Sequence, residues 1–197
     1  MMSVKILCAA MGLCLSLAAC AVGNTTDYRD VVPPLGVATQ KTVAVETIDM
    51  RPYVLADDNT PQWVGMVRGG FGNPFGVHTQ SGAPLATDLT QATISSLKAS
   101  GVKAAPATAR TASDRNLRIT VRDWKTDSMF TTSVYFNAEA EVRDQAGTVL
   151  ARNAVNDKVV HDNESMNLPS TKLERAKAAF KTFMDRLLDG GIRQALR

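Results

Sequence analysis

The stretch VYFNAEAEVRDQAGTVLARNAVNDKVV, residues 134–160, decides the fold class. Its first ten residues place Val, Phe and Ala alternately with more polar side chains, which is the pattern of a strand with one buried and one wet face. Residues 144–147 are rich in turn formers, and their glycine supplies the positive φ that such turns need. Residues 148–160 then predict a second strand that pairs back as a hairpin.

The segments around this hairpin predict the other strands of the sheet and the helices that cover it. Residues 42–48 form a β-branched run and residues 117–122 alternate, so both predict strands, and residues 63–67 predict a short one. Apolar spacing predicts a helix over residues 85–97 and another after Pro169. This order predicts an α+β fold, a two-layer sandwich with a mixed, mostly antiparallel sheet of about four strands covered on one face by two helices.

The first twenty residues have the features of a secretory signal that ends in a lipidation site. Lys5 is the only early charge, and residues 6–19 contain no other. This apolar run is shorter than the roughly 20 helical residues that cross a bilayer, and it fits a signal peptide. It closes as Leu-Ala-Ala-Cys20, which resembles the lipobox of bacterial lipoproteins, where diacylglycerol and a further acyl chain such as palmitate are attached to the cysteine. We therefore predict a signal peptide over residues 1–19 and lipid attachment at Cys20.

The remaining chain divides into a linker and one domain. Residues 20–40 are predicted to be the lipidated cysteine and a flexible tether. They show no hydrophobic periodicity of a helix or strand, and they contain two consecutive prolines. Residues 41–197 are predicted to be a single periplasmic α+β domain, a length that one hydrophobic core can serve. Ala21, where an Asp would favour the inner membrane, indicates the outer membrane of a Gram-negative bacterium. An ordinary secretory peptide with a chance cysteine is the alternative.

Composition argues against several classes of function. Lys and Arg number 22 against 19 Asp and Glu, and they are scattered, so no patch for nucleic acid is expected. Cleavage before Cys20 would remove the other two cysteines, which leaves no disulfide, cysteine nucleophile or thiolate metal site. The glycine-rich residues 68–76 match no phosphate-binding motif, and Pro74 lacks the N–H that such a loop uses. We expect no cofactor and no metal.

The candidate binding residues follow the first predicted strand. Asp49 and Arg51 leave that strand and are placed to pair with Arg68 and with the following loop respectively, as a partner-binding surface or a structural clamp. Phe71 and Phe75 either anchor the glycine-rich loop over a sheet edge or contact a partner, because glycines allow close approach and aromatic side chains supply contact area. The polar face of strand 134–143 is either solvated or a docking surface.

With these elements placed, the chain resembles the YajG-type bacterial lipoproteins. Beside the lipobox, the resemblance is carried by the patterns Val43-Ala44-Val45-x-x-x-Asp49-x-Arg51-Pro52 and Gly65-x-x-x-Arg68-Gly69-Gly70. The insertion between Arg51 and Gly65 and the extended tether depart from the family. The resemblance implies an outer-membrane lipoprotein with no assigned enzymatic activity.

The expected function is that of a non-enzymatic domain, held on the membrane by its N-terminal lipid and facing the periplasm, that binds an envelope protein as an adapter. One alternative is a carrier or accessory factor in lipid or lipopolysaccharide transport or envelope assembly, which predicts an apolar cleft near the glycine-rich loop. Another is an envelope hydrolase, which predicts a polar cleft around His161 or paired carboxylates.

Overall fold

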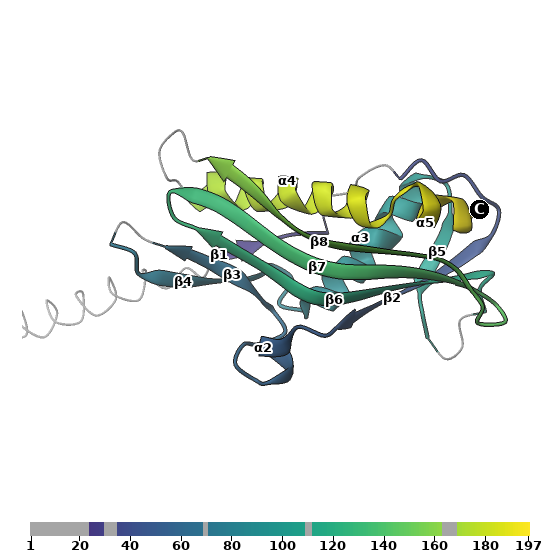
Figure 1. Ribbon diagram of the computed structural model, residues 1–197, viewed down its shortest axis with the longest axis horizontal. Coiled ribbons are helices and arrows are strands. Elements are labelled where there is room, and N and C mark those ends of the chain that lie inside the picture. The colour runs from purple at the N-terminus through teal and green to yellow at the C-terminus, as the bar shows by residue number, and fades with distance from the viewer. Residues whose placement is uncertain (1–23, 30–34, 69–70, 109–111, 163–168) are drawn as a thin grey trace, which may run out of the picture.

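Three long strands that run antiparallel to one another form the centre of the fold (Figure 1). They are β6 (Arg115–Ser128), β7 (Thr131–Asp144) and β8 (Val149–Asp162), each of 14 residues. The predicted alternation holds in β7, where Phe136, Ala138 and Ala140 are buried. The computed structural model describes residues 24–29, 35–68, 71–108, 112–162 and 169–197.

The edge of β6 that faces away from β7 carries two strands in line. Strand β2 (Thr42–Asp49) pairs in parallel with the first half of β6, and β3 (Trp63–Arg68) pairs in parallel with its last residues. Each then has further neighbours: β5 (Lys103–Pro106) pairs with β2, β4 (Pro74–Thr79) pairs with β3, and β1 (Asn24–Thr26) pairs with β4. Within the described residues the sheet therefore has eight strands and divides in two along β6.

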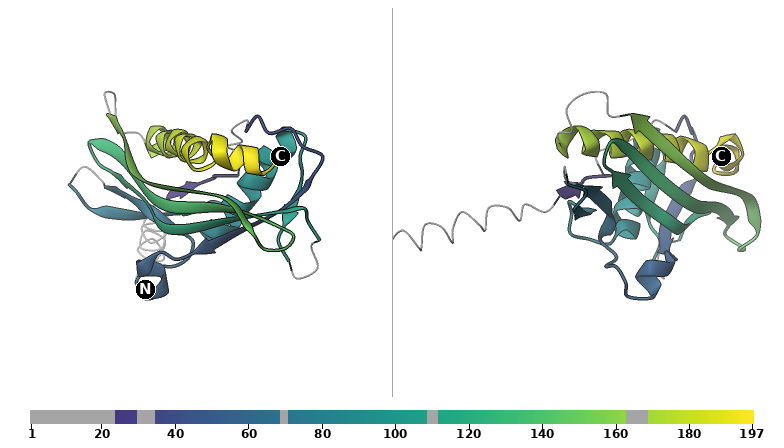
Figure 2. Two further views of the ribbon diagram at one scale, coloured as in Figure 1. Left: turned by 45° about the vertical axis from the view of Figure 1, so that its right-hand side comes forward. Right: turned by 60° about the vertical axis from the view of Figure 1, so that its left-hand side comes forward.

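Three helices cover one face of this sheet (Figure 2). Helix α3 (Leu85–Ala99) packs on β2 and β5, α4 (Pro169–Leu187) packs on β7, β8 and β1, and α5 (Gly190–Ala195) packs on β8 and β7. The short helix α2 (Pro52–Leu55) lies apart from them, in the excursion between β2 and β3 (Figure 1). No helix in the described ranges combines the length and the apolar character that a membrane span requires.

An aromatic cluster fills the space between α4 and the sheet. Trp124 is fully buried at its centre, with the ring centroid of Phe183 at 4.9 Å and that of Tyr28 at 5.4 Å. Phe136 and Phe180 complete the cluster. Such rings bury large apolar areas, so the stripe on the last helix that the sequence predicts is part of the main core.

The predicted fold class, a two-layer sandwich with about four mostly antiparallel strands and two helices, is wrong. The described residues form eight strands with both parallel and antiparallel pairs, and four helices. Three of these strands, β1, β4 and β5, are not predicted from the sequence because they are only three to six residues long and contain Thr, Gly, Ala and Pro. These segments become strands because a neighbouring strand offers hydrogen-bond partners, which is a tertiary effect that local propensity does not show.

The structure also differs from the flexible tether predicted over residues 20–40. Asn24–Thr26 is strand β1, and the side chains of Tyr28, Leu35 and Val37 are buried in the core. The hydroxyl of Tyr28 accepts a hydrogen bond from the Trp124 indole N–H at 3.1 Å. The domain therefore begins at or before residue 24. The predicted signal peptide and Cys20 lie outside the described residues.

Candidate functional site

Tyr53 fills the gap between the two strands that share one edge of β6. The chain leaves the sheet after Asp49 and returns at Trp63, so residues 122–125 of β6 have no strand partner there. The Tyr53 hydroxyl donates to the carbonyl oxygen of Trp124 at 2.8 Å and accepts from its N–H at 3.3 Å. One phenol thus satisfies backbone groups that a strand would otherwise pair. Burial raises the pKa of Tyr53 to about 12.

Arg51 joins the end of β2 to the beginning of β3. Its side chain is fully buried, and its Nε and Nη2 bind the two carboxylate oxygens of Asp49 at 2.8 and 2.7 Å. The same guanidinium donates to the carbonyl oxygens of Trp63 at 2.7 Å and Pro61 at 2.9 Å. Burial alone would lower the pKa of Arg51, but the hydrogen bonds and charge of Asp49 raise it overall. This clamp is a structural element, since the Arg51 guanidinium is enclosed and the Asp49 carboxylate is only 15% exposed.

Gly65 lets β3 rejoin the sheet immediately after the clamp. Its φ is +137°, and a Cβ built there would lie 2.1 Å from the carbonyl oxygen of Thr126 on β6. The register of β3 against β4 shifts at this point, between Trp63 and Gly65. Only a residue without a side chain fits so close to the neighbouring backbone.

The other predicted residues lie apart from the clamp, at the end of the sheet where β3 and β6 finish. Arg68 pairs with Asp127 through bonds of 3.1 and 3.2 Å, and both side chains are partly exposed. The predicted pairing of Asp49 with Arg68 is therefore not seen, because Asp49 binds Arg51. Within the described residues, Arg51 bonds to Asp49 and to the carbonyl oxygens of Pro61 and Trp63 rather than to the glycine-rich loop after Arg68 that is predicted as its partner.

Three exposed phenylalanines form what we call the aromatic tip, Phe71, Phe75 and Phe130. They are 99, 51 and 71% exposed. Phe71 and Phe75 belong to the β3–β4 hairpin, and Phe130 belongs to the β6–β7 turn beside it. A Cβ added at Gly72 would lie 3.9 Å from the Met129 side chain, which places the two turns next to each other. Sequence reasoning singled out Phe71 and Phe75 but missed Phe130, whose signal is a lone aromatic residue at a turn between two strands.

A hollow of about 300 Å³ lies beside the aromatic tip. Phe130 and Tyr135 line it together with three charged residues, Arg68, Asp127 and Lys158. The Lys158 ammonium lies 4.9 Å from the centre of the Tyr135 ring. The walls of this hollow are mixed in character, whereas the carrier alternative predicts an apolar cleft at this loop.

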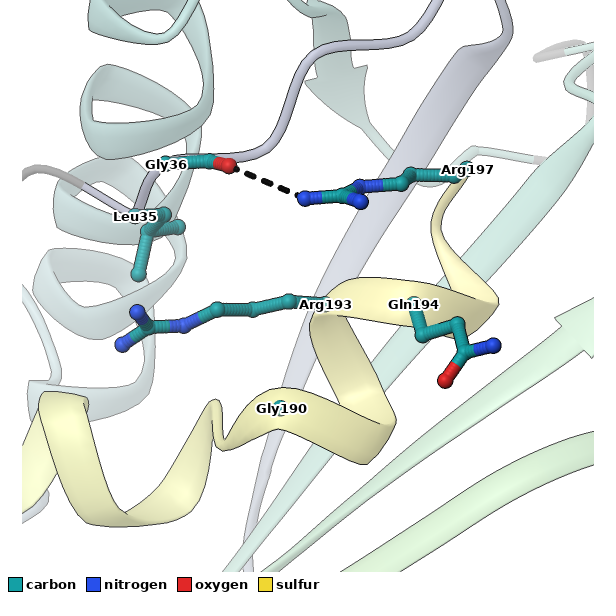
Figure 3. A pocket seen from close by; sticks show the side chains of 6 residues that line it. All are labelled: Leu35, Gly36, Gly190, Arg193, Gln194 and Arg197. Carbon is teal, nitrogen blue, oxygen red and sulfur yellow. Dashed lines mark hydrogen bonds between the residues drawn. The ribbon is translucent and has the colours of Figure 1, made fainter.

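A larger hollow of about 650 Å³ lies where α5 faces residues 35–36 (Figure 3). Both of its arginines are held by neighbouring groups of the chain. Arg197 donates to the carbonyl oxygen of Gly36 at 3.4 Å, and Arg193 binds the Leu188 carbonyl and the Asp185 carboxylate. The hollow is a seam between segments of the chain, and its two cationic side chains are already engaged within the protein.

The face of the sheet opposite the helices carries a network of ion pairs. Arg152 binds the carboxylates of both Glu139 and Glu141, and Arg143 also binds Glu141. Hydrogen bonds from Arg152 and Arg143 hold the pKa of Glu141 below its usual value. The charges on this face largely compensate one another, which explains the polar half of the alternating pattern.

Strand β8 forms a long edge of the sheet. Within the part of the chain that the structure describes, it pairs only with β7. None of its residues from 149 to 161 is buried, and Val149, Leu150 and Val160 are more than 40% exposed. A strand of this length with open backbone groups is a template for another strand, and proteins usually shorten or cover such edges.

The two histidines lie apart in the sheet. His78 in β4 is paired in register with Trp63, and His161 at the end of β8 is paired with Thr132. Across the described ranges, no group of three or more His, Cys, Asp or Glu side chains is arranged to hold a metal. Part of the sequence cluster around His161, residues 163–164, lies outside those ranges.

Comparisons with known proteins leave the family open. No protein-family model and no curated protein matches the chain. Among solved structures, the Xanthomonas campestris protein XCC0632 of family DUF330 is similar over 88% of this chain and 94% of its own, with 16% identity and a TM-score of 0.49. The lipoprotein GNA1162 of Neisseria meningitidis is similar over 73% of this chain and 96% of its own, at 16% identity and a TM-score of 0.29.

A Caulobacter crescentus protein described as a lipoprotein is similar over 86% of this chain and 97% of its own, at 12% identity and a TM-score of 0.33. Two of these three neighbours are thus called lipoproteins, and none of the three is called a YajG protein. Their TM-scores lie below 0.5, so the likeness does not extend to function.

Proposed function

We propose that this chain is a lipid-anchored envelope lipoprotein whose folded domain binds another envelope protein without catalysing a reaction. The anchor is Cys20, at the end of the Leu-Ala-Ala-Cys sequence that follows the apolar signal segment. The outer membrane, with the domain in the periplasm, is the location that Ala21 favours. Several acyl chains on one cysteine would hold the domain on its membrane lastingly.

The open edge of β8 is the observation that carries the binding role. Its outward backbone N–H and C=O groups are best satisfied by an extended segment that adds a strand to the sheet. The inward-facing Ala151, Val155 and Val159 pack against the core on the face that α4 and α5 contact, but they stay partly exposed. We infer that the partner is an extended segment of a different envelope polypeptide.

In-cell photo-crosslinking along β8 tests this role. A photoreactive residue is placed singly at each position from 152 to 158, with Ala146 in the exposed β7–β8 turn as the control position. Strand addition predicts adducts with one polypeptide, and the crosslinked positions on it should move by one residue for each step along β8. Adducts with β8 of a second copy of this chain would contradict the proposal that the partner is a different polypeptide. Absence of adducts, with incorporation equal to the control, would contradict strand addition altogether.

A further inference from the structure

We propose that the aromatic tip inserts into the surface of the bilayer that holds the lipid anchor, so that the domain lies against its membrane. This inference rests on lipidation of Cys20, as set out in the proposed function. It adds a membrane contact made by the folded domain itself. The surface concerned is Phe71, Phe75 and Phe130, with the charged hollow beside them.

The chain between the lipid anchor and the folded domain is short. Only Ala21, Val22 and Gly23 separate Cys20 from Asn24, the first residue of β1. A fully extended chain over these four steps spans at most about 14 Å. The predicted tether of about twenty residues would have allowed the domain to stand well away from the bilayer. The three residues that remain between Cys20 and β1 are too few to hold the domain away from the bilayer.

This short link holds one end of the molecule at the membrane. Strand β1 runs parallel to β4, with Asn24 paired to Val77, so the chain enters β1 from the side on which β4 begins. Val77 lies three residues, or about 10 Å of strand, from Pro74 at the start of β4. The β3–β4 hairpin and the β6–β7 turn meet at this same end of the sheet (Figure 1). The aromatic tip is therefore within reach of the surface that holds the lipid.

The chemistry of the tip suits the surface of a bilayer. Phe71 is almost completely exposed, and with the more than half exposed Phe75 and Phe130 it forms an apolar projection at this end of the sheet. Aromatic side chains favour the boundary between head groups and acyl chains. The adjoining hollow has two cationic residues, Arg68 and Lys158, and one carboxylate, Asp127. The one excess positive charge is suited to anionic lipid head groups.

The opposite end of the sheet supplies an internal control. The β7–β8 turn lies at the far end of β7, and 14 residues of strand separate it from the aromatic tip by about 43 Å. Leu150, next to that turn, is exposed like the tip residues. If the tip lies in the bilayer, a probe at Leu150 lies well outside it.

The test uses the lipidated chain purified from membranes and reconstituted into vesicles of phosphatidylethanolamine and phosphatidylglycerol in a 3:1 ratio. Phe71→Cys is labelled with a polarity-sensitive fluorophore, and Leu150→Cys is the matched variant. The only native cysteine of the processed chain is Cys20, whose thiol is blocked once acylated. Lipids with nitroxide groups on their acyl chains quench a fluorophore that lies among those chains.

We expect quenching at position 71 at least twofold stronger than at position 150, with a blue-shifted emission only at 71. Equal, weak quenching at both positions, in vesicles that retain the protein, would overturn membrane docking while leaving the anchor intact. Labelling of the protein without an added cysteine would show a free thiol, either at Cys20 or in an uncleaved signal segment, and would overturn the lipid anchor itself. The two failures are thereby distinguishable.

Discussion

Arg51 shows how a single side chain holds two strands in line on one edge of β6. Its guanidinium uses three nitrogens to bind one carboxylate and two backbone carbonyls, all within 2.9 Å. Removal of one member of a buried ion pair leaves the other charge without compensation, which is why such pairs are costly to break. The contacts of Arg51 also hold the start of β3, and with it the path of the chain toward the aromatic tip.

Replacement of Arg51 should therefore destabilise the whole domain. Arg51→Met is expected to lower the free energy of unfolding by about 3–5 kcal/mol, because Asp49 and the carbonyl of Trp63 lose their partner. Arg68→Met, which breaks the partly exposed pair with Asp127, should shift the urea midpoint far less, because solvent screens that pair. Urea unfolding followed by circular dichroism measures both. Equal losses in the two variants would contradict the clamp.

Gly65 is a second position where the fold depends on one residue. Gly65→Ala should shift the urea midpoint strongly downward, because the new methyl group meets backbone atoms of Thr126 that cannot move aside. Gly147→Ala serves as the control, since Gly147 also has a positive φ but open space around it, and should cost only about 1 kcal/mol. If the two variants are equally stable, β3 does not approach β6 as described.

At the residue scale the sequence singles out particular residues but does not show how they pair. The Asp49-x-Arg51 pattern and the glycine at position 65 stand out because few residue types suit such positions. The partner of Asp49 was missed because an ion pair between residues two apart needs a local bend, which the excursion supplies. Tyr53 carries no sequence signal, since its role arises only when β2 and β3 share one edge.

At the scale of elements, the segment from Asn24 to Val37 changes the account most. The sequence predicts a tether here, yet the described part of the segment contributes a strand and three buried apolar side chains. No periodicity in the sequence indicates this, because the buried apolar residues in the described parts, 24–29 and 35–37, are isolated anchors rather than a repeating face. The long β6–β7–β8 meander was predictable for the opposite reason, since strict alternation persists over many residues.

Truncation of Tyr28 tests whether this N-terminal segment belongs to the domain. Tyr28→Ala should lower the free energy of unfolding by about 3–5 kcal/mol, because it empties a fully buried site against Trp124. Tyr135→Ala, on the opposite face of the sheet, is the matched change and should cost less than half as much. Thermal or urea unfolding of both variants decides the matter. A Tyr28→Ala protein as stable as the parent chain would contradict the packing of this segment and support the predicted tether.

At the scale of the whole molecule, two tyrosines couple stability to alkaline pH. Burial raises the pKa values of Tyr28 and Tyr53 to about 12, against about 10 for an unfolded tyrosine. The unfolded chain therefore loses these protons first, so their contribution is complete below pH 10 and is lost as the pH rises toward 12. The expected slope is up to about 1.4 kcal/mol per pH unit for each tyrosine.

Replacement of one tyrosine should reduce this slope. The free energy of unfolding of Tyr28→Phe should decline less steeply between pH 10 and pH 12 than that of the parent chain, whatever the difference between them at pH 8. Urea titrations at five pH values give both curves. Identical slopes would show that Tyr28 titrates alike in the folded and unfolded chains, which contradicts its burial.

The proposed organisation of the whole molecule combines a lipid anchor, a membrane-facing tip and an open strand edge. The sequence contains the lipobox and the hairpin, because both depend on local patterns. The division of the sheet at β6, the edge of β8 and the meeting of Phe71 with Phe130 depend on contacts between distant segments, so they could not be predicted. If Cys20 is lipidated, the aromatic tip lies at the bilayer and β8 extends away from it toward a partner.

The intact mass of the protein extracted from the cell envelope tests this account most directly. We predict a chain that begins at Cys20 and carries diacylglycerol and one further acyl chain, and a Cys20→Ser variant that keeps residues 1–19 and carries no lipid. A processed chain without lipid, or one that begins at another residue, would contradict the anchor on which the account depends.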